Sequence, residues 1–307
     1  MHAQAVPSAA SAPMQNGSDP VRVAFLGADV WLDGCVPPAS TDGMVVRRVR
    51  LDEPPPDGVV AVINEFGPDV TVIIDPLRLP GDVLGSLPGL RLGMLVDGAP
   101  SAEQAAAVRG LDRVVSFQPS LSGAPIPGGR VWRAVPPPVS DALFADVRRL
   151  HGRPQAMTVG ASTEWREYML IRAKHHNNLL QVIHGVSGAS LIELLGEYDV
   201  GVYVPRARGG GFSQQVGMHL AAGQLLLADT LVPAHGLERN IDYLHIDSPE
   251  GLVKHLDRLG RFPEMYHRVR IRGRRKAEQY RASRLFGRVL HDLLADVDAF
   301  GSDRGRA

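Results

Sequence analysis

The sequence predicts an α/β protein made of two successive units, each a parallel sheet flanked by helices. Short apolar runs alternate with helical or loop segments along most of the 307 residues. Several of these runs end in Gly, Asp or Pro, as strands do where they reach the ligand-binding edge of an open parallel sheet. Three prolines at 136–138 and the polar, turn-rich segment 148–154 then separate the first series of runs from a second.

The first unit begins with the apolar run VRVAFL and continues with five further runs of the same kind. We expect strands over 21–26, 44–51, 70–74, 91–96, 114–117 and 131–135, with a short helix over 59–66. The regular alternation and the strand endings predict a Rossmann-like half. The Gly27-Ala28-Asp29 turn lacks the spaced glycines of a dinucleotide-binding fingerprint, which argues against a dehydrogenase.

The second unit repeats this organisation. We expect strands over 156–159, 180–184, 200–204, 224–228 and 243–246, helices over 164–175, 188–196 and 249–259, and a largely helical segment over 263–300. The predicted domains are a disordered tail over 1–20, a first domain over 21–150, a second over 151–283, and a C-terminal helix and tail over 284–307. The tail is predicted from its Ala, Ser and Pro content.

Composition excludes several classes of function. The formal net charge is zero, so the sequence calls for neither nucleic acid nor an anionic membrane as a partner. The arginine-rich segment 268–288 is interleaved with apolar residues, and we interpret it as a solvated helix face. Cys35 is the only cysteine, so no intrachain disulfide is possible and a reducing cytoplasm is the expected compartment. No apolar run reaches the length of a membrane span, and residues 1–19 do not resemble a signal peptide.

The segment GGGFSQQVGMHLAAGQLLLAD, residues 209–229, is the most informative part of the chain. A glycine run leads into a short helix, which is followed by an apolar strand that ends in an aspartate. Backbone N–H groups at such a helix start favour a bound phosphate. The candidate phosphate-binding residues are Gly211, Phe212, Ser213 and Gln214. The alternative is a flexible surface loop that needs glycine only for its turns.

Several segments occur together in an order and spacing typical of one family. In the second half they are MTVGASTEWRE (157–167), HGV (184–186), YDV (198–200), FSQQV (212–216), LAAG (220–223), LAD (227–229) and YLHIDSPEGL (243–252). In the first half they are LVDGAP (95–100) and LDRVVSF (111–117). Together they resemble the group-1 glycosyltransferases of the GT-B fold, especially the branch similar to the spore-maturation CgeB proteins.

The resemblance implies two Rossmann-like domains facing across a cleft, with C-terminal helices. It also implies a glycosyltransferase that moves a sugar from a nucleotide sugar to an unknown small-molecule, glycan or protein acceptor, with no cofactor and no metal. The family usually has arginine and glutamate where this chain has Gln215 and Met218. Because that glutamate normally helps to hold the ribose, a non-catalytic binding or scaffold protein is the alternative.

By the same resemblance, the turn after the first strand of the second domain contributes to the donor site. The candidates there are Gly160, Ser162, Thr163 and Arg166. An arginine can pair with a phosphate. The hydroxyl groups of Ser162 or Thr163 can instead cap the following helix.

Five residues are candidates for the ribose and base region. The resemblance places His184 and Met218 there, and His219 follows Met218 on the same predicted helix. His235 and Glu238 lie in a loop after a strand, where an α/β crevice binds ligands, and Glu238 is a possible substitute for the missing glutamate. The alternatives are a buried helix histidine satisfied by a neighbour for His219, and an ordinary turn with solvated side chains for the loop.

The acceptor's general base would come from the first domain. Residues 3–150 contain no histidine, so a carboxylate is the ordinary candidate. Asp97 lies in a segment that resembles the family, whereas Asp29 has only its position after a strand; each can instead cap a turn. His175 and His176 are adjacent on a predicted helix and point in different directions, so we expect no metal site.

Overall fold

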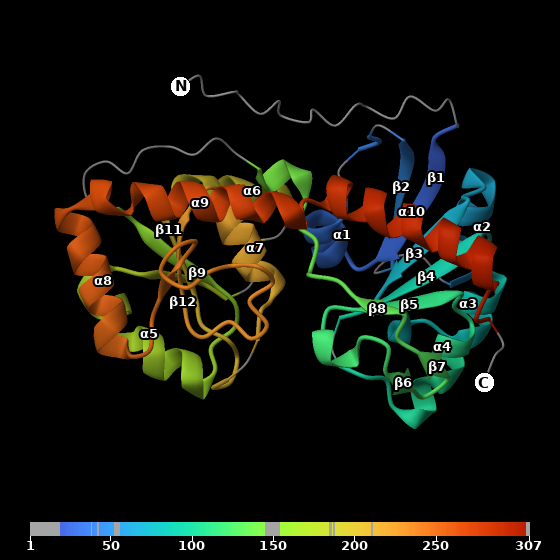
Figure 1. Ribbon diagram of the computed structural model, residues 1–307, viewed down its shortest axis with the longest axis horizontal. Coiled ribbons are helices and arrows are strands. Elements are labelled where there is room, and N and C mark those ends of the chain that lie inside the picture. The colour runs from blue at the N-terminus through green and yellow to red at the C-terminus, as the bar shows by residue number, and fades with distance from the viewer. Residues whose placement is uncertain are drawn as a thin grey trace, which may run out of the picture.

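The computed structural model describes residues 19–37, 39–41, 43–51, 56–96, 98–144, 154–183, 186, 188–209 and 211–304. The chain forms two lobes that lie side by side, each built around one main sheet (Figure 1). Residues 1–18 of the predicted tail and the predicted domain boundary at 150–151 lie outside the described residues. Within the described part, no helix is both long and apolar enough to cross a membrane.

The first sheet has six parallel strands in the order β2-β1-β3-β4-β5-β8. They are β1 (Val21–Gly27), β2 (Met44–Arg50), β3 (Val70–Ile74), β4 (Leu90–Leu95), β5 (Arg113–Ser116) and β8 (Arg133–Ala134). The predicted strands are confirmed, although the last one is only two residues long. A small antiparallel pair lies outside this sheet: β6 (Pro125–Ile126) and β7 (Gly129–Arg130). The helices of this lobe are α1 (Asp29–Cys35), α2 (Pro56–Phe66), α3 (Gly81–Ser86) and α4 (Ala105–Arg109).

The second sheet has five parallel strands in the order β10-β9-β11-β12-β13. They are β9 (Ala156–Val159), β10 (Leu180–Val182), β11 (Val200–Tyr203), β12 (Leu225–Ala228) and β13 (Leu244–His245). The later helices are α5 (Glu164–Asn177), α6 (Gly188–Glu197), α7 (Gln214–Ala221), α8 (Pro249–Arg261), α9 (His267–Ala277) and α10 (Ala282–Phe300). The second-half strands and helices expected from the sequence are therefore present.

Both sheets share one strand order. In each, the first strand lies between the second and the third, so the chain leaves the first strand on one side and returns on the other. This reversal opens a crevice outside the carboxyl ends of β1 and β3 in the first sheet, and of β9 and β11 in the second. Loops that follow these four strands are therefore the positions at which a ligand is expected.

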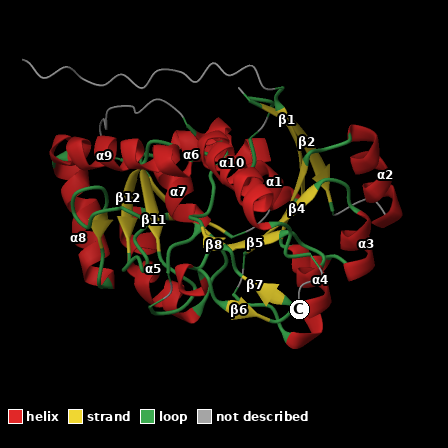
Figure 2. Ribbon diagram, turned by 45° about the vertical axis from the view of Figure 1, so that its right-hand side comes forward, coloured by secondary structure: helices red, strands yellow, loops and turns green. Residues whose placement is uncertain are grey.

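Helix α10 belongs to the first lobe although it follows the whole second lobe in sequence. Its buried side chains join the core formed by the first sheet, and the ring of Phe286 packs edge-on against Phe25 with 4.7 Å between centroids. Arg113 and Arg133 reach from the sheet to Asp296 and Asp292 of α10, each at 2.6 Å. Figure 2 shows α9 and α10 following one another along the same side of the molecule.

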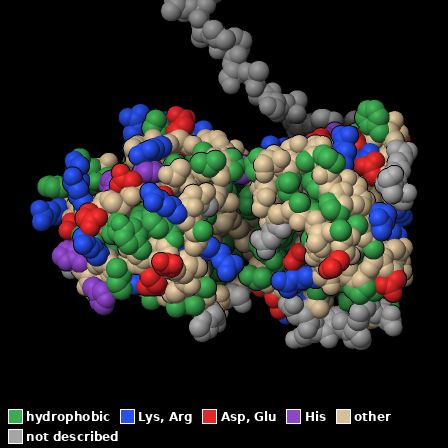
Figure 3. Space-filling view, turned by 90° about the horizontal axis from the view of Figure 1, so that it is seen from below, with side chains coloured by type: hydrophobic (Ala, Val, Ile, Leu, Met, Phe, Trp, Pro, Cys, Tyr) green, Lys and Arg blue, Asp and Glu red, His purple; other side chains and the backbone are tan. Residues whose placement is uncertain are grey.

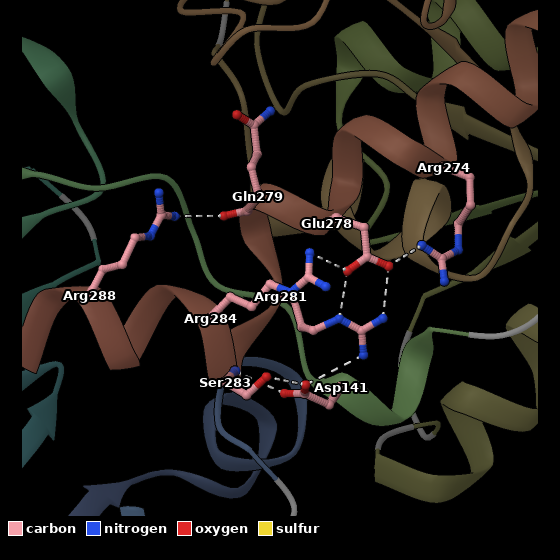
Figure 4. Close-up of polar contacts among 8 residues, drawn as sticks. All are labelled: Asp141, Arg274, Glu278, Gln279, Arg281, Ser283, Arg284 and Arg288. Carbon is pink, nitrogen blue, oxygen red and sulfur yellow. Dashed lines mark hydrogen bonds and ion pairs between the residues drawn. The ribbon is translucent and has the colours of Figure 1, made fainter. Parts of the chain in front are cut away.

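Within the described ranges, two segments connect the lobes, around Val139 and around Tyr280, and they are hydrogen-bonded to each other. The backbone N–H of Val139 donates to Tyr280 O, and that of Ala282 donates to Val139 O, each at 2.8 Å. Glu278 accepts hydrogen bonds from Arg281 at 2.8 Å and from Arg274 at 2.9 Å (Figure 4). Asp141, on the other crossing, accepts a hydrogen bond from the backbone N–H of Ser283 at 2.9 Å. One polar cluster thus fastens both connections.

Candidate functional site

The crevice of the second sheet is formed by the loops after β9 and β11. The first contains Gly160, Ser162 and Thr163, and the second runs from 204 to the start of α7 at Gln214. Thr163 caps α5, because its hydroxyl oxygen accepts from the N–H of Arg166 at 3.3 Å, and the same hydroxyl donates to Arg206 O at 2.7 Å. Thr163 therefore caps the helix, which was the alternative to binding a phosphate. It also fixes the loop after β9 to the loop after β11.

Arg166 also joins these two loops. Its guanidinium donates to Val204 O at 2.8 Å and to Ala161 O at 2.9 Å, and the residue is buried. Burial lowers the pKa of this guanidinium from its usual value. Gly160 has a φ of +123°, and a Cβ there would collide with the Arg166 guanidinium. These contacts favour a structural role for Arg166, in which it holds the two loops together, over its predicted role as the partner of a phosphate.

The glycine-rich loop is held closely against its neighbours. The buried Tyr203 hydroxyl donates to Gly211 O at 2.6 Å, and a Cβ on Gly211 would collide with Val232 O. Ser213 caps α7 by accepting from the N–H of Gln215 at 3.3 Å. These contacts give Gly211 and Ser213 a defined geometry, which argues against the alternative of a loop that needs glycine only for flexibility.

A cavity of about 270 Å³ lies between the lobes, beside the start of α7. Gln214, Gln215 and Met218 line it on one side, and α1 lines it on the other; Figure 3 shows the furrow between the two lobes. The full lining is Val30, Asp33, Gly34, Leu143, Val159, Ile183, Val186, Gly188, Leu191, Ile192, Gln214, Gln215 and Met218. Most of these side chains are apolar, so the few polar groups decide how a ligand is oriented.

The first lobe contributes residues to the cavity that were not predicted from the sequence. Asp33 lines the cavity, forms an ion pair with Arg48, and lies against Gly188 at the start of α6. Gln214 crosses to the first lobe, where its side-chain amide donates to Cys35 Sγ at 3.0 Å. The one sequence signal for these residues was that they directly follow the first strand of an open parallel sheet, where ligands bind.

Met218 lines the cavity, but the neighbouring candidate His219 points into the core. Nδ1 of His219 lies 2.5 Å from Oε1 of Gln224, and Gln224 in turn donates to Leu195 O at 2.8 Å. Burial lowers the pKa of His219 to about 4, against the opposing effect of this hydrogen bond. His219 is therefore a buried histidine whose imidazole is hydrogen-bonded by a neighbour, as the alternative interpretation proposed. Its location does not support contact with a ribose.

His235 and Glu238 lie outside the cavity. The ring of His235 packs edge-on against Phe212, with 4.7 Å between centroids, so the fold does bring together two of the predicted residues. Nε2 of His235 is buried without a hydrogen-bond partner among the described residues, and burial lowers the pKa of this imidazole. Glu238 is exposed and lies 3.8 Å from Nζ of Lys276.

Two predicted residues, Asp97 and His184, lie outside the described residues, so their proposed roles stay predictions. Ser162 is exposed and receives a weak hydrogen bond from Gln181 at 3.4 Å. In the described ranges, no three His, Cys, Asp or Glu side chains are grouped so that they could hold a metal ion.

Comparison with known proteins gives similarity in structure alone. No protein-family model matches the sequence, and no curated protein is similar enough to count as a relative. The structure is similar to HepE of Anabaena, solved with UDP, with a TM-score of 0.53 and 10% identity over 89% of this chain and 100% of that one. It is also similar to sucrose-phosphate synthase of Thermosynechococcus elongatus (TM-score 0.56, 10% identity, 90% and 99% covered) and to a glycosyltransferase of Rickettsia africae (0.54, 12%, 90% and 98%).

These similarities define the class of architecture. Two parallel α/β sheets, a cavity between their lobes and a C-terminal helix that returns to the first lobe form the GT-B fold, which the structural neighbours share. The fold class predicted from the sequence is therefore confirmed. HepE has also been solved with UDP-glucose, so nucleotide-sugar binding is documented for that neighbour.

Proposed function

We propose that this protein is a glycosyltransferase that transfers a sugar from a nucleotide sugar to an acceptor held by the first lobe. The observation that carries the proposal is the cavity between the lobes, which is bounded by the start of α7 and by α1. In this proposal the protein belongs to the CgeB-like branch of the group-1 glycosyltransferases, which its motifs resemble, and acts in the cytoplasm. The transfer needs no cofactor or metal in this proposal.

The nucleoside end of the donor would occupy the cavity. Its volume of about 270 Å³ is slightly below the ~300–1,000 Å³ usual for ligand pockets, so the sugar would extend into the furrow between the lobes. Met218 stands where the resemblance implies a ribose-binding glutamate. Asp33, which enters the same cavity from α1, is the carboxylate we propose for contact with the ribose.

The chemistry would be a direct displacement at the anomeric carbon. The acceptor oxygen attacks that carbon, the bond to the diphosphate breaks, and the acceptor proton passes to a base on the first lobe. Backbone N–H groups at 211–214 and the start of α7 would stabilise the leaving diphosphate, because a helix N-terminus favours negative charge. Asp97 is the base that we propose from the sequence.

A nucleotide panel tests this proposal through thermal stability. We expect one of UDP, GDP, TDP or CMP, or a sugar derivative of it, to stabilise the protein by about 2.7 kcal/mol when present at roughly a hundredfold excess over its dissociation constant. Gln215→Glu should abolish most of this gain in stability. The substitution places a negative charge at the cavity wall, where it repels the phosphate groups of the nucleotide. Release of the nucleoside diphosphate from the sugar nucleotide then reports turnover.

Gln104→Glu is the matched control. It adds the same charge on the first lobe outside the cavity, and the capping box that holds Gln104 accepts glutamate equally well. Glu238→Ala should also leave binding unchanged, because Glu238 lies outside the cavity. If no nucleotide stabilises the protein, the proposal is wrong; binding without turnover would instead identify a scaffold protein of this fold.

A further inference from the structure

A second cavity opens at the carboxyl edge of the second sheet, beside the start of α5. Its volume is about 660 Å³, and it shares no lining residue with the cavity between the lobes. It is lined by Thr163, Glu164, Trp165, Tyr168, Arg206, Ala207, Arg208 and Asp247. These residues come from three loops or helix starts at the carboxyl edge of the sheet, where α/β proteins bind ligands.

An aromatic pair forms one wall of this second cavity. The rings of Trp165 and Tyr168 are stacked, with 5.4 Å between centroids and 23° between planes. The indole N–H of Trp165 donates to Oδ2 of the buried Asp229 at 3.1 Å, so the pair is held in one orientation. Tyr168 is nevertheless 58% exposed. The fold therefore presents a fixed aromatic surface to the solvent.

Charged groups of both signs surround the aromatic pair. The Arg208 guanidinium lies 5.6 Å from the Trp165 ring centroid, and Thr163 fixes the backbone of Arg206 through its 2.7 Å hydrogen bond. Within the described part of the chain, no ion pair joins either arginine to a carboxylate. Glu164 and Asp247 add two carboxylates to the lining.

We propose that this second cavity binds a neutral saccharide, independently of the donor site. The apolar face of a pyranose ring packs on an exposed aromatic ring, and its hydroxyl groups donate to carboxylates and accept from arginines. Two carboxylates beside two arginines give the lining no net charge, so a polyanion such as a nucleic acid is disfavoured. The preformed aromatic surface also reduces the ordering cost of binding.

The location of the second cavity suggests a role for saccharide binding in the transfer reaction. Arg206 and Arg208 belong to the same loop as Gly211 and Ser213, between β11 and α7. A glycan held by this loop would stay close to the proposed donor site without occupying it. The second cavity would therefore raise the local concentration of a saccharide chain near the furrow, as a linked binding site does.

A direct binding experiment tests the inference. The full-length protein is titrated with maltopentaose, cellopentaose, laminaripentaose, chitopentaose and mannopentaose, and saturation-transfer NMR reports contact with the sugar. We expect at least one pentasaccharide to bind, and Tyr168→Ala to weaken it by roughly tenfold. Tyr168→Phe keeps the ring and should bind within about twofold of the original protein. Arg208→Ala should also weaken binding.

Phe300→Ala is the control, because Phe300 is 72% exposed and lines a different part of the surface. Thermal unfolding of each variant checks that it is folded. The inference is overturned if no pentasaccharide binds, if Tyr168→Ala binds as well as Tyr168→Phe, or if UMP or single-stranded DNA occupies the second cavity in place of sugar. Nucleotide-dependent stabilisation reads out the donor site separately, so the two proposals can fail independently.

Discussion

Gly201→Ala should destabilise the protein by about 3 kcal/mol. Gly201 lies in the buried strand β11, and a Cβ there would collide with the imidazole of His219 and lie 2.7 Å from Oε1 of Gln224. The added methyl group therefore crowds a packed core. It also separates a buried polar pair, since His219 and Gln224 are both shielded from solvent.

Urea unfolding of the purified variant measures this effect. Gly287→Ala is the matched control, because a Cβ on this residue of α10 meets nothing within 4 Å. Alanine is favoured over glycine in a helix by ~1 kcal/mol, so the control should be neutral or stabilised. Equal stability of the two variants would show that His219 and Gln224 are not packed against β11 as described.

Glu278→Ala should destabilise the connection between the lobes by about 1–2 kcal/mol at pH 7. Hydrogen bonds, chiefly from Arg281 and also from Arg274, lower the pKa of the Glu278 carboxyl to about 2, although burial opposes them. The carboxyl group is 27% exposed, so solvent screens part of the interaction. Without it, Arg274 and Arg281 lose their shared partner in the cluster of Figure 4.

The effect has a defined dependence on pH. Because folding lowers the pKa of Glu278 from 4.5 to about 2, its contribution is complete above pH 4.5 and is lost as the pH falls towards 2. The difference in urea midpoint between Glu278→Ala and the original protein should therefore narrow over that range. Glu250→Gln breaks the exposed pair with Arg172 and should cost below about 0.5 kcal/mol. A Glu278→Ala midpoint equal to that of this control would contradict the prediction.

The sequence predicted the sheets well because buried parallel strands are short runs of apolar residues. β3 and β12, with the sequences VTVII and LLLA, are fully buried in the structure. Three helices of the first lobe were not predicted. α1, α3 and α4 have only seven, six and five residues, which is too short for a clear helical period.

The site was predicted in part, and the reason for the rest is spatial. The glycine-rich loop was predicted from local sequence, and Met218, which lines the cavity, was predicted from the family resemblance. Asp33 was missed because it meets Gly188 across the lobes, and sequence periodicity carries no information on such contacts. Arg166 and His219 have polar side chains suited to ligands, and only the structure shows that backbone carbonyls and Gln224 satisfy them.

The return of α10 to the first sheet affects how the chain can fold during synthesis. The strands of the first lobe leave the ribosome early, but Leu285, Phe286, Val289 and Leu290 complete its core only after the second lobe has been made. Until then, α1 covers only part of this apolar face of the nascent sheet, which favours aggregation or chaperone binding. We expect a fragment that ends before α10 to behave in the same way, because its core lacks these side chains.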